Sequence, residues 1–428
     1  MHGVQSLFSK GVRMNRHFVT LALAALVVVV ACRKEETGTA LGTTYAQIAR
    51  PAIWRVLPRT QAESIGLEPG DVITSYSDEP VATTEELVQL QFKSVGSQEK
   101  IPMTVLRGDA EVKFEATPGV LGVLPDAERY PAGLAVALKD VLGYYGVTAD
   151  YDWLAALTGE SFAFTARREV CRGVWPDGLS GRYLEGLTKY YGLTFHTILA
   201  GATDSARPEA MATIREKLSR GKPLLVFGAW PGRNGSSWGI AVRYNPGDSS
   251  VYGYAPGSAG QMKLSGPIAE AYDVARRVTA DPDPAQMLAT VLTQALELGQ
   301  ASSDTGWQSG IAAYDLWMKG LDTVPFCPVC PDSGRECFDR LTWALLANKE
   351  SANSFLQDMR EALPDQTDLI DEAIAKNTAI IGKLDGIIQS GVKIGTRESQ
   401  QKLARAVNEI QLDETDLLGL YDDIIGQL

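Results

Sequence analysis

The sequence predicts a multidomain protein with an α+β domain, then an α/β domain, then a mainly α-helical C-terminal region. Short strand-like segments separated by glycine and proline occupy residues 37–123. Helical and strand-like patterns alternate over residues 124–274, which is typical of a domain that mixes helices with a sheet. Apolar residues recur at three- and four-residue spacing through most of residues 275–428, which is the period of amphipathic helices. A chain of 428 residues is long enough for this organisation.

Residues 1–36 carry the signals of an exported protein that is held on a membrane. Arg13 and Arg16 precede an apolar run at 19–30, which is too short for a spanning helix and typical of a secretory signal. The run ends at Cys32 and the chain turns polar at once, which resembles the lipobox of bacterial lipoproteins. We therefore expect lipidation at Cys32, because acyl chains hold a protein on a membrane without a spanning segment. The alternative is an ordinary signal peptide with an incidental cysteine.

The residues after Cys32 bear on location. The body would face the periplasm of the cell envelope, since a secretory signal directs export. Arg33 and Lys34 stand where an aspartate is linked to retention at the inner membrane in lipoproteins. The outer membrane is therefore favoured.

Composition and charge exclude one class of partner and limit the chemistry. A formal net charge of -12 argues against nucleic-acid binding, because phosphates require a basic surface. Lipidation of Cys32 would leave four of the five cysteines, and an even number in an oxidising compartment favours disulfides. His196 is the only histidine beyond the signal region, so any histidine-dependent mechanism in the mature chain must use it.

Residues 37–123 contain the elements of one compact domain. Ile53–Leu57 is an apolar, β-prone stretch between two prolines and predicts a strand. Gly66–Ile73 predicts a tight turn that enters a second strand. Thr83–Glu86 predicts a helix start, because a threonine hydroxyl can accept from free backbone amides there. Ile101–Glu115 predicts a β-hairpin.

The order of these elements resembles a bacterial PDZ domain. The resemblance rests on Ala62–Ile73 (AESIGLEPGDVI), the helix start at Thr84 and the stretch Val105–Gly108. It implies that a peptide or protein C-terminus adds as a strand to an exposed edge of the Ile53–Leu57 strand, between that strand and the Glu85–Gln91 helix. The ligand carboxylate would meet the loop before that strand, where Pro51 has no amide hydrogen to donate.

The resemblance implies peptide-binding roles for residues of this loop, strand and helix: Ile48, Ala49, Arg50, Ala52, Ile53, Trp54, Arg55, Leu87 and Leu90. Arg50 would supply positive charge for the carboxylate in place of the missing amide. The alternative is a PDZ fold that serves as a docking or spacer module, because a fold alone does not fix a function.

The middle region, 124–274, is expected to combine helices with strands. Its expected helices are 133–145, 151–157 and 181–191, and its expected strands are 193–199, 223–227, 238–244 and 250–254. This order resembles the papain-like fold of bacteriocin-leader peptidases, and more closely the related domain of the butirosin biosynthesis acyltransferase family. The resemblance rests on these motifs: Ala137–Gly146, Tyr151–Leu154, Leu157–Phe162, Arg220–Val226, Trp238–Tyr244 and Val251–Gly253.

The resemblance implies that this domain has lost its catalytic residues. A papain-type enzyme needs a cysteine at a helix N-terminus, a histidine to exchange the proton and a residue that orients the histidine. Gly133, Trp238 and Ala255 stand at these positions, and none carries the required group. The alternative is a thiol peptidase or acyltransferase in which Cys171 is the nucleophile and His196 is the base.

From about Ile268 onward the pattern predicts helices, at 284–298, 306–321, 334–363, 369–387 and 397–425. Cys327 and Cys330 form a CxxC pair near Cys337, but three cysteines fall short of the four ligands of a structural zinc site. A redox pair is a further alternative, although no thioredoxin-like context surrounds it. We expect no metal and no cofactor, and disulfides whose pairing is open among the candidates Cys171, Cys327, Cys330 and Cys337.

The sequence therefore predicts a lipid-anchored envelope protein that binds peptide or protein partners and carries a catalytically degenerate papain-like domain. The thiol enzyme that uses Cys171 and His196 is one alternative function. A structural tether without a small ligand is the other.

Overall fold

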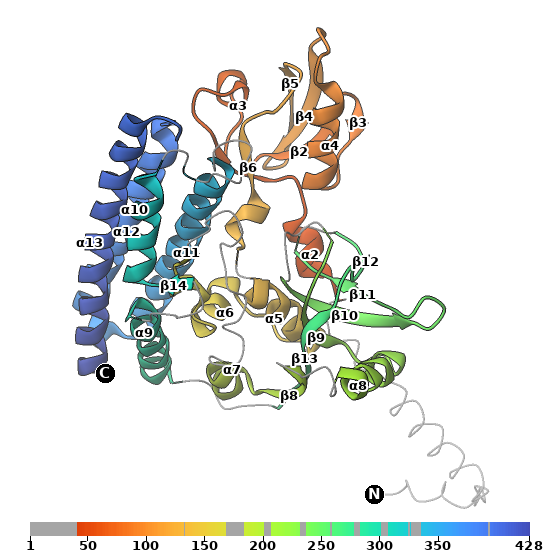
Figure 1. Cartoon of the computed structure of the whole chain (residues 1–428), viewed down its shortest axis with the longest axis vertical. Coiled ribbons are helices and arrows are strands. Elements are labelled where there is room, and N and C mark those ends of the chain that lie inside the picture. The colour runs from red at the N-terminus through yellow and green to blue at the C-terminus, as the bar shows by residue number, and fades with distance from the viewer. Residues whose placement is uncertain are drawn as a thin grey trace, which may run out of the picture.

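The computed structural model describes residues 41–131, 133–167, 184–200, 207–231, 237–256, 259–277, 283–300, 307–323, 326, 335–392 and 394–428. A mixed α/β part is followed by a helical C-terminal part (Figure 1), which confirms the coarse fold class. Within these ranges no helix is long and apolar enough to cross a membrane. Cys32 and the predicted signal lie outside the described residues.

The N-terminal unit, residues 41–125, combines a four-stranded sheet with short helices. The sheet has the antiparallel order β3-β2-β4-β5, and β1 pairs separately with β6. The elements are α2 (Thr43–Ile48), β1 (Ile53–Val56), α3 (Gln61–Ile65), β2 (Val72–Tyr76), β3 (Glu79–Pro80), α4 (Thr84–Ser94), β4 (Ile101–Arg107), β5 (Ala110–Ala116) and β6 (Val123–Pro125). The predicted hairpin and helix start are confirmed, and the Thr83 hydroxyl accepts from the Glu86 amide at 3.2 Å.

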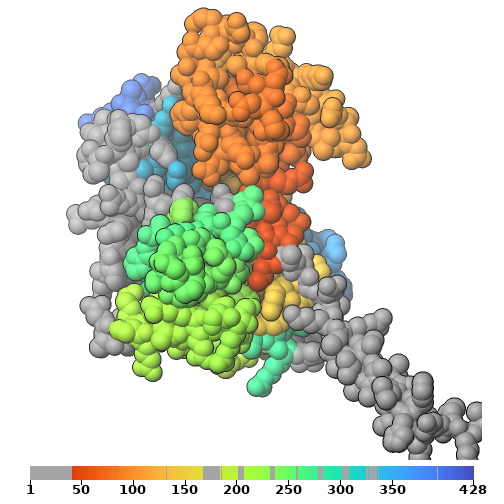
Figure 2. Space-filling model, turned by 90° about the vertical axis from the view of Figure 1, so that its right-hand side faces the viewer, coloured from red at the N-terminus to blue at the C-terminus, as the bar shows by residue number. Residues whose placement is uncertain are grey.

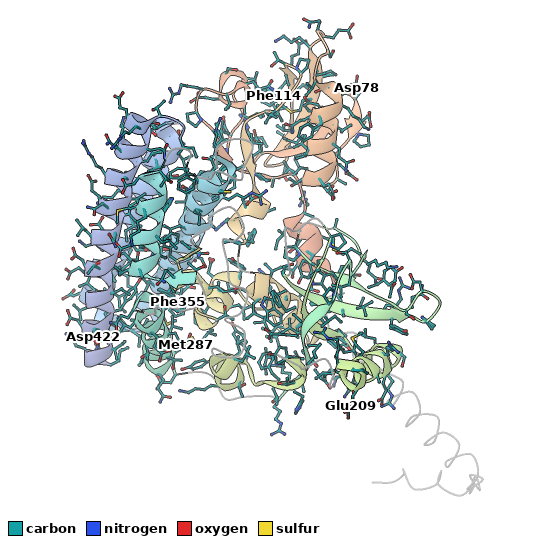
Figure 3. All side chains as sticks on the ribbon, in the orientation of Figure 1. Asp78, Phe114, Glu209, Met287, Phe355 and Asp422 are labelled. Carbon is teal, nitrogen blue, oxygen red and sulfur yellow. The ribbon has the colours of Figure 1, made fainter. Side chains whose placement is uncertain are left out.

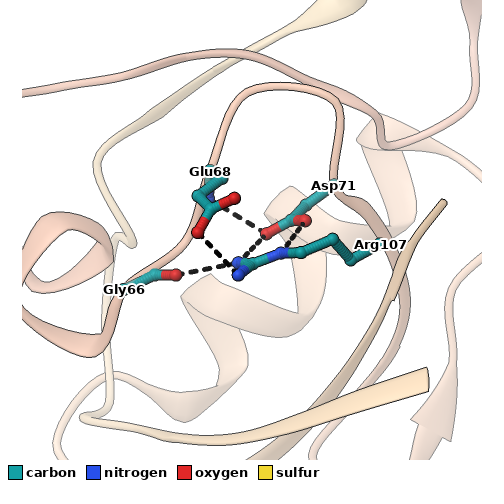
Figure 4. A network of polar contacts seen from close by, with 4 residues as sticks. All are labelled: Gly66, Glu68, Asp71 and Arg107. Atoms are coloured by element: carbon teal, nitrogen blue, oxygen red, sulfur yellow. Dashed lines mark hydrogen bonds and ion pairs between the residues drawn. The ribbon is translucent and has the colours of Figure 1, made fainter. Parts of the chain in front are cut away.

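Arg107 ties the turn before β2 to the end of β4 (Figure 4). Its Nε and Nη2 each donate to the Asp71 carboxylate at 2.8 Å, while Nη1 donates to Glu68 at 2.7 Å and Nη2 also donates to the Gly66 carbonyl at 2.8 Å. Burial raises the pKa of Asp71, but the bonds from Arg107 and the Glu68 amide outweigh it and hold the pKa below its usual value. A bidentate charged pair of this kind fixes the turn.

The middle region contains a six-stranded sheet of order β12-β11-β10-β9-β13-β8, antiparallel throughout. The strands are β8 (Leu193–Ala200), β9 (Leu224–Gly228), β10 (Ser237–Asn245), β11 (Ser250–Tyr254), β12 (Met262–Lys263) and β13 (Ile268–Arg276). One sheet face packs on α8 (Arg207–Ser219) and the other on α5 (Gly133–Tyr144), which adjoins α6 (Tyr151–Leu157).

The helical pattern expected from about Ile268 onward is wrong over its first residues, because Ile268–Arg276 forms the strand β13. It lies between β9 and β8 and pairs with both, which makes it an interior strand of the sheet. Buried Ala271, Tyr272 and Val274 contact the layers on its two faces. Tertiary pairing therefore overrides a composition that suits a helix.

The C-terminal region is built of the helices α9 (Pro284–Gln300), α10 (Ile311–Leu321), α11 (Arg335–Ala362), α12 (Thr367–Ser390) and α13 (Arg397–Gln427). One hydrophobic core runs from these helices into α5 and α6. Phe355 and Met287 lie inside it, whereas Asp422 lies on the outer surface (Figure 3). The helices therefore pack on the middle region as one continuous structure.

The helix expected over 306–321 begins later than predicted. Residues Trp307–Ser309 form strand β14, which pairs with β7 (Thr165–Arg167), and α10 starts only after Gly310. Gly310 has a φ of 57°, and a Cβ there would lie 2.1 Å from the Gly299 carbonyl oxygen. Only glycine suits both the backbone conformation and the close approach, so the chain turns sharply at this residue.

Candidate functional site

The strand edge expected to receive a peptide is occupied by the chain itself. Along β1, Ile53 faces Pro125 and Val56 faces Val123 of β6. The Leu57 amide then donates to the Gly122 carbonyl at 2.9 Å. At the other edge of β1, the Ile53 amide donates to Asp71 O at 2.8 Å. The edge of β1 that β6 covers is therefore not exposed, and the opposite edge is engaged at Ile53.

The loop before β1 offers carbonyls rather than amides to α4. The Thr84 amide donates to the Ala49 carbonyl at 2.8 Å, and the Thr84 hydroxyl donates to the Arg50 carbonyl at 3.3 Å. The Ala52 amide donates back to Arg50 O at 2.8 Å. A carboxylate is bound by donors, so the geometry expected for carboxylate capture in this loop is absent from these residues. Arg50 itself is exposed.

Most of the side chains predicted to contact a peptide are buried inside the protein. Ile53, Leu87 and Leu90 are buried in the core of the N-terminal unit, whereas Trp54 and Ile48 belong to the core shared with the middle and helical regions. Ala49 is also buried. These side chains therefore pack inside the protein, and the peptide contacts expected of them stay a prediction.

Trp54 and Arg55 bind the helical region. Trp54 Nε1 donates to Glu350 of α11 at 3.2 Å, and Arg55 forms ion pairs with Glu350 and with Asp385 of α12, the latter at 3.1 Å. The Arg55 guanidinium also stacks on the Trp54 ring, 4.9 Å from its centroid. These contacts dock the N-terminal unit on the helices.

Gly133 and Trp238, which the papain-like resemblance places at the cysteine and histidine positions, lie close together. A Cβ built on Gly133, at the start of α5, would lie 3.8 Å from the Trp238 Cβ on β10. Tyr254 pairs with Ile240, so Ala255 follows opposite the residue after Trp238. Trp238 and Ala255 are both buried, and none of the three positions carries a nucleophile or a base. The arrangement cannot activate a thiol.

A buried carboxylate occupies the helix N-terminus next to these positions. Glu160 lies in the short helix Glu160–Phe162, and its carboxylate accepts from the Ala135 amide at 3.1 Å and the Thr158 hydroxyl at 3.0 Å. Burial raises the pKa of Glu160 to about 7, although these hydrogen bonds act in the opposite direction. The first-turn amides of α5, which would lower the pKa of a cysteine there, are thus bound by Glu160. No sequence pattern indicated this residue.

Of the alternative catalytic pair Cys171 and His196, only His196 lies among the described residues. His196 is exposed on the edge strand β8, opposite Asp273, whose carboxylate binds Lys217 at 2.8 Å and Lys222 at 2.6 Å. Cys171 lies outside the described residues, so its distance from His196 stays untested. Cys327 and Cys330 also lie outside them, while Cys337 is buried on α11. Within the described ranges no group of three or more His, Cys, Asp or Glu side chains is arranged to hold a metal ion.

Helix α4 carries an apolar surface that the sequence reasoning missed. Phe92 is 68% exposed, Val95 63% and Val88 43%. The Leu121 amide donates to Gln91 and the Gly119 amide to Ser94, so 70%-exposed Val120 lies alongside this helix. We call Val88, Phe92, Val95 and Val120 the α4 patch. The sequence could have indicated this patch, because α4 has apolar residues on two faces, whereas packing on the core requires only one apolar face.

The α4 patch belongs to the upper part of the molecule, which Figure 2 shows as a separate lobe above the β10–β12 part of the sheet, with α2 between them. The Gly42 and Thr44 amides donate to Asp140 of α5 at 2.6 and 3.1 Å, which fixes α2 on the middle region.

No family model matches this chain, and no curated protein sequence matches it.

Proposed function

We propose that this protein is a bacterial lipoprotein, anchored through Cys32, whose PDZ-like N-terminal unit binds a protein partner in the cell envelope. The papain-like middle domain is a non-catalytic framework. In this proposal the partner binds the α4 patch and not the edge of β1. The observation that carries the proposal is the concentration of exposed large apolar side chains on one short helix and the loop beside it.

Exposed apolar residues that stand singly are ordinary, but a cluster points to an interaction surface. Four of the seven exposed large hydrophobic residues among the described ranges belong to the α4 patch. Burying one phenylalanine side chain stabilises a complex by roughly 1.5–3 kcal/mol. Phe92 is therefore expected to contribute most to partner affinity.

The non-enzymatic part of the proposal rests on the chemistry of the α5 N-terminus. Gly133 offers no thiol, Trp238 no proton exchange, and Glu160 takes the amides that would stabilise a thiolate. A thiol enzyme that uses Cys171 and His196 remains the alternative function. Asp273, which pairs with exposed His196 across the strands, binds Lys217 and Lys222.

The test is site-specific photocrosslinking in cells that make the full chain. Benzoylphenylalanine is placed at Phe92, or at Glu209 as the control, which is exposed on α8 of the middle region (Figure 3). We expect discrete crosslinked species from position 92 and none from position 209. A Val95→Asp substitution in the patch should remove them without changing the folded spectrum. Equal crosslinking from both positions, or none from position 92, would leave the tether as the better explanation.

A further inference from the structure

A cavity of about 330 Å³ lies where the N-terminal unit meets the helical region. Its walls come from the loop Leu57–Thr60 after β1, from the first turns of α11 and from the end of α12 with the residues after it. Small-molecule sites in proteins span roughly 300–1,000 Å³, so this cavity has room for one small group and not for a folded partner.

The wall of the cavity is mainly apolar. Phe338 and Ile387 are buried side chains of the main core, while Trp343, Ile388 and Val392 are only partly buried and line the same space. Apolar surface removed from water stabilises a bound state by roughly 25 cal/mol per Å². The wall therefore suits an aliphatic or aromatic group.

Two guanidinium groups also line the cavity. Arg59 is exposed and has a φ of 57°, a left-handed conformation that is uncommon away from glycine. Its Nη2 donates to the Ser390 carbonyl, and a Cβ on Gly391 would lie only 2.3 Å from that nitrogen. The chain thus holds an arginine over the end of α12 at the expense of backbone strain, and such strain gathers at functional sites.

Arg335 supplies the second guanidinium, and its ion pair is loose. Its Nε lies 3.7 Å from Asp339 Oδ2, which is too long for a hydrogen bond. Among the described residues that line the cavity, Arg59, Arg335 and Asp339 are the charged ones, and together they give a formal charge of +1 within a chain whose net charge is -12. The site therefore complements an anion, and a planar guanidinium binds carboxylates particularly well.

We infer that this cavity binds a carboxylate-terminated apolar group, with its apolar part against Phe338, Trp343 and Ile388 and its carboxylate at Arg59 and Arg335. Two sources share this chemistry, the C-terminal residue of a peptide with a large apolar side chain and a free fatty acid. The site is separate from the α4 patch, so its occupancy and partner binding at that patch can succeed or fail independently.

The experiment photolabels the full-length protein extracted from membranes. The fatty-acid probe is dodecanoic acid with a diazirine in its chain, and its neutral counterpart is the methyl ester. The peptide probe is a short peptide that ends in photoleucine with a free carboxylate, and its counterpart is the C-terminal amide. We expect mass spectrometry to place label within the segments that line the cavity, 57–60, 335–343 and 387–394, at least tenfold more from a carboxylate probe than from its neutral counterpart.

Two variants and one control test the assigned residues. Arg335→Ala should lower labelling about tenfold, since a hydrogen bond to a charged group is lost. Arg360→Ala should leave it unchanged, because Arg360 also lies on α11 in an ion pair with an aspartate, has a similar exposure (45% against 49%) and does not line the cavity. Val392→Trp should fill the cavity and block labelling.

Labelling by the fatty acid alone or by the peptide alone would identify the source of the group. The inference is overturned if label falls outside these three segments, or if neutral and charged probes label equally. It is also overturned if neither probe labels, or if Arg335→Ala and Val392→Trp, both shown to be folded by circular dichroism, label like the unsubstituted protein.

Discussion

Replacing Glu160 by glutamine should change how the stability of the protein depends on pH. The pKa of Glu160 is raised from 4.5 to about 7 in the folded protein, mainly by burial. Because the folded pKa lies above the unfolded one, its favourable contribution is complete below pH 4.5 and is lost as pH rises towards 7. At 1.36 kcal/mol per pH unit, this interval corresponds to about 3 kcal/mol of unfolding free energy. Glutamine keeps an acceptor for the Ala135 amide but cannot ionise.

The assay compares urea unfolding of the unsubstituted protein and Glu160→Gln at pH 4.5 and pH 8, followed by circular dichroism. The free energy of unfolding of the variant, relative to the unsubstituted protein, should rise by up to about 3 kcal/mol from the lower to the higher pH. Thr213→Ser, at a half-buried position of α8 in the middle region, serves as a control and should show no such change. If the difference between Glu160→Gln and the unsubstituted protein is the same at both pH values, Glu160 does not titrate as an acid buried at the start of α5.

Three further substitutions test the packing of the separate regions. Lys349 Nζ lies 2.6 Å from the buried Glu414 carboxylate. Lys349→Met should destabilise the protein by about 3–5 kcal/mol in urea unfolding, because it leaves this carboxylate without its charged partner. The double variant with Glu414→Leu should recover most of that loss, and a double variant as unstable as the single one would contradict the pairing. Asp71→Asn should lower stability at pH 6 and less at pH 3, because Arg107 holds the pKa of Asp71 low, and the contribution that is complete above the unfolded value of 3.8 is lost as pH falls through the lower folded value. Gly310→Ala should lower the melting temperature, since its backbone is left-handed and its Cβ would meet a carbonyl oxygen; an unchanged melting temperature would show that the turn can relax.

Local features were predictable from sequence because their causes lie within a few residues. The Thr83 capping box, the Ile101–Glu115 hairpin and the helices α5, α6, α11, α12 and α13 follow from capping chemistry, turn chemistry and apolar spacing. The strand β13 was not predictable, because its alanine-rich pattern suits a helix and only its two neighbours in the sheet make it a strand.

The errors at the candidate site arise from contacts between distant segments. β6 is only three residues long, and nothing in Val123–Pro125 indicates that it covers β1. Arg55 binds Glu350, about 300 residues later in the chain, so no local pattern shows that this arginine is engaged. Gly133 and Trp238 do lie together, and periodicity within either segment could not indicate this contact between distant parts of the chain.

The most direct test of a lipid-anchored, non-catalytic protein is the intact mass of the mature chain purified from membranes, with and without reduction and brief thiol alkylation. We predict a chain that begins at Cys32, carries acyl groups there and takes up alkylating reagent only after reduction. A chain without acyl groups would contradict the anchor. A Cys171 thiol that alkylates rapidly without reduction would contradict the non-catalytic assignment and favour the thiol enzyme.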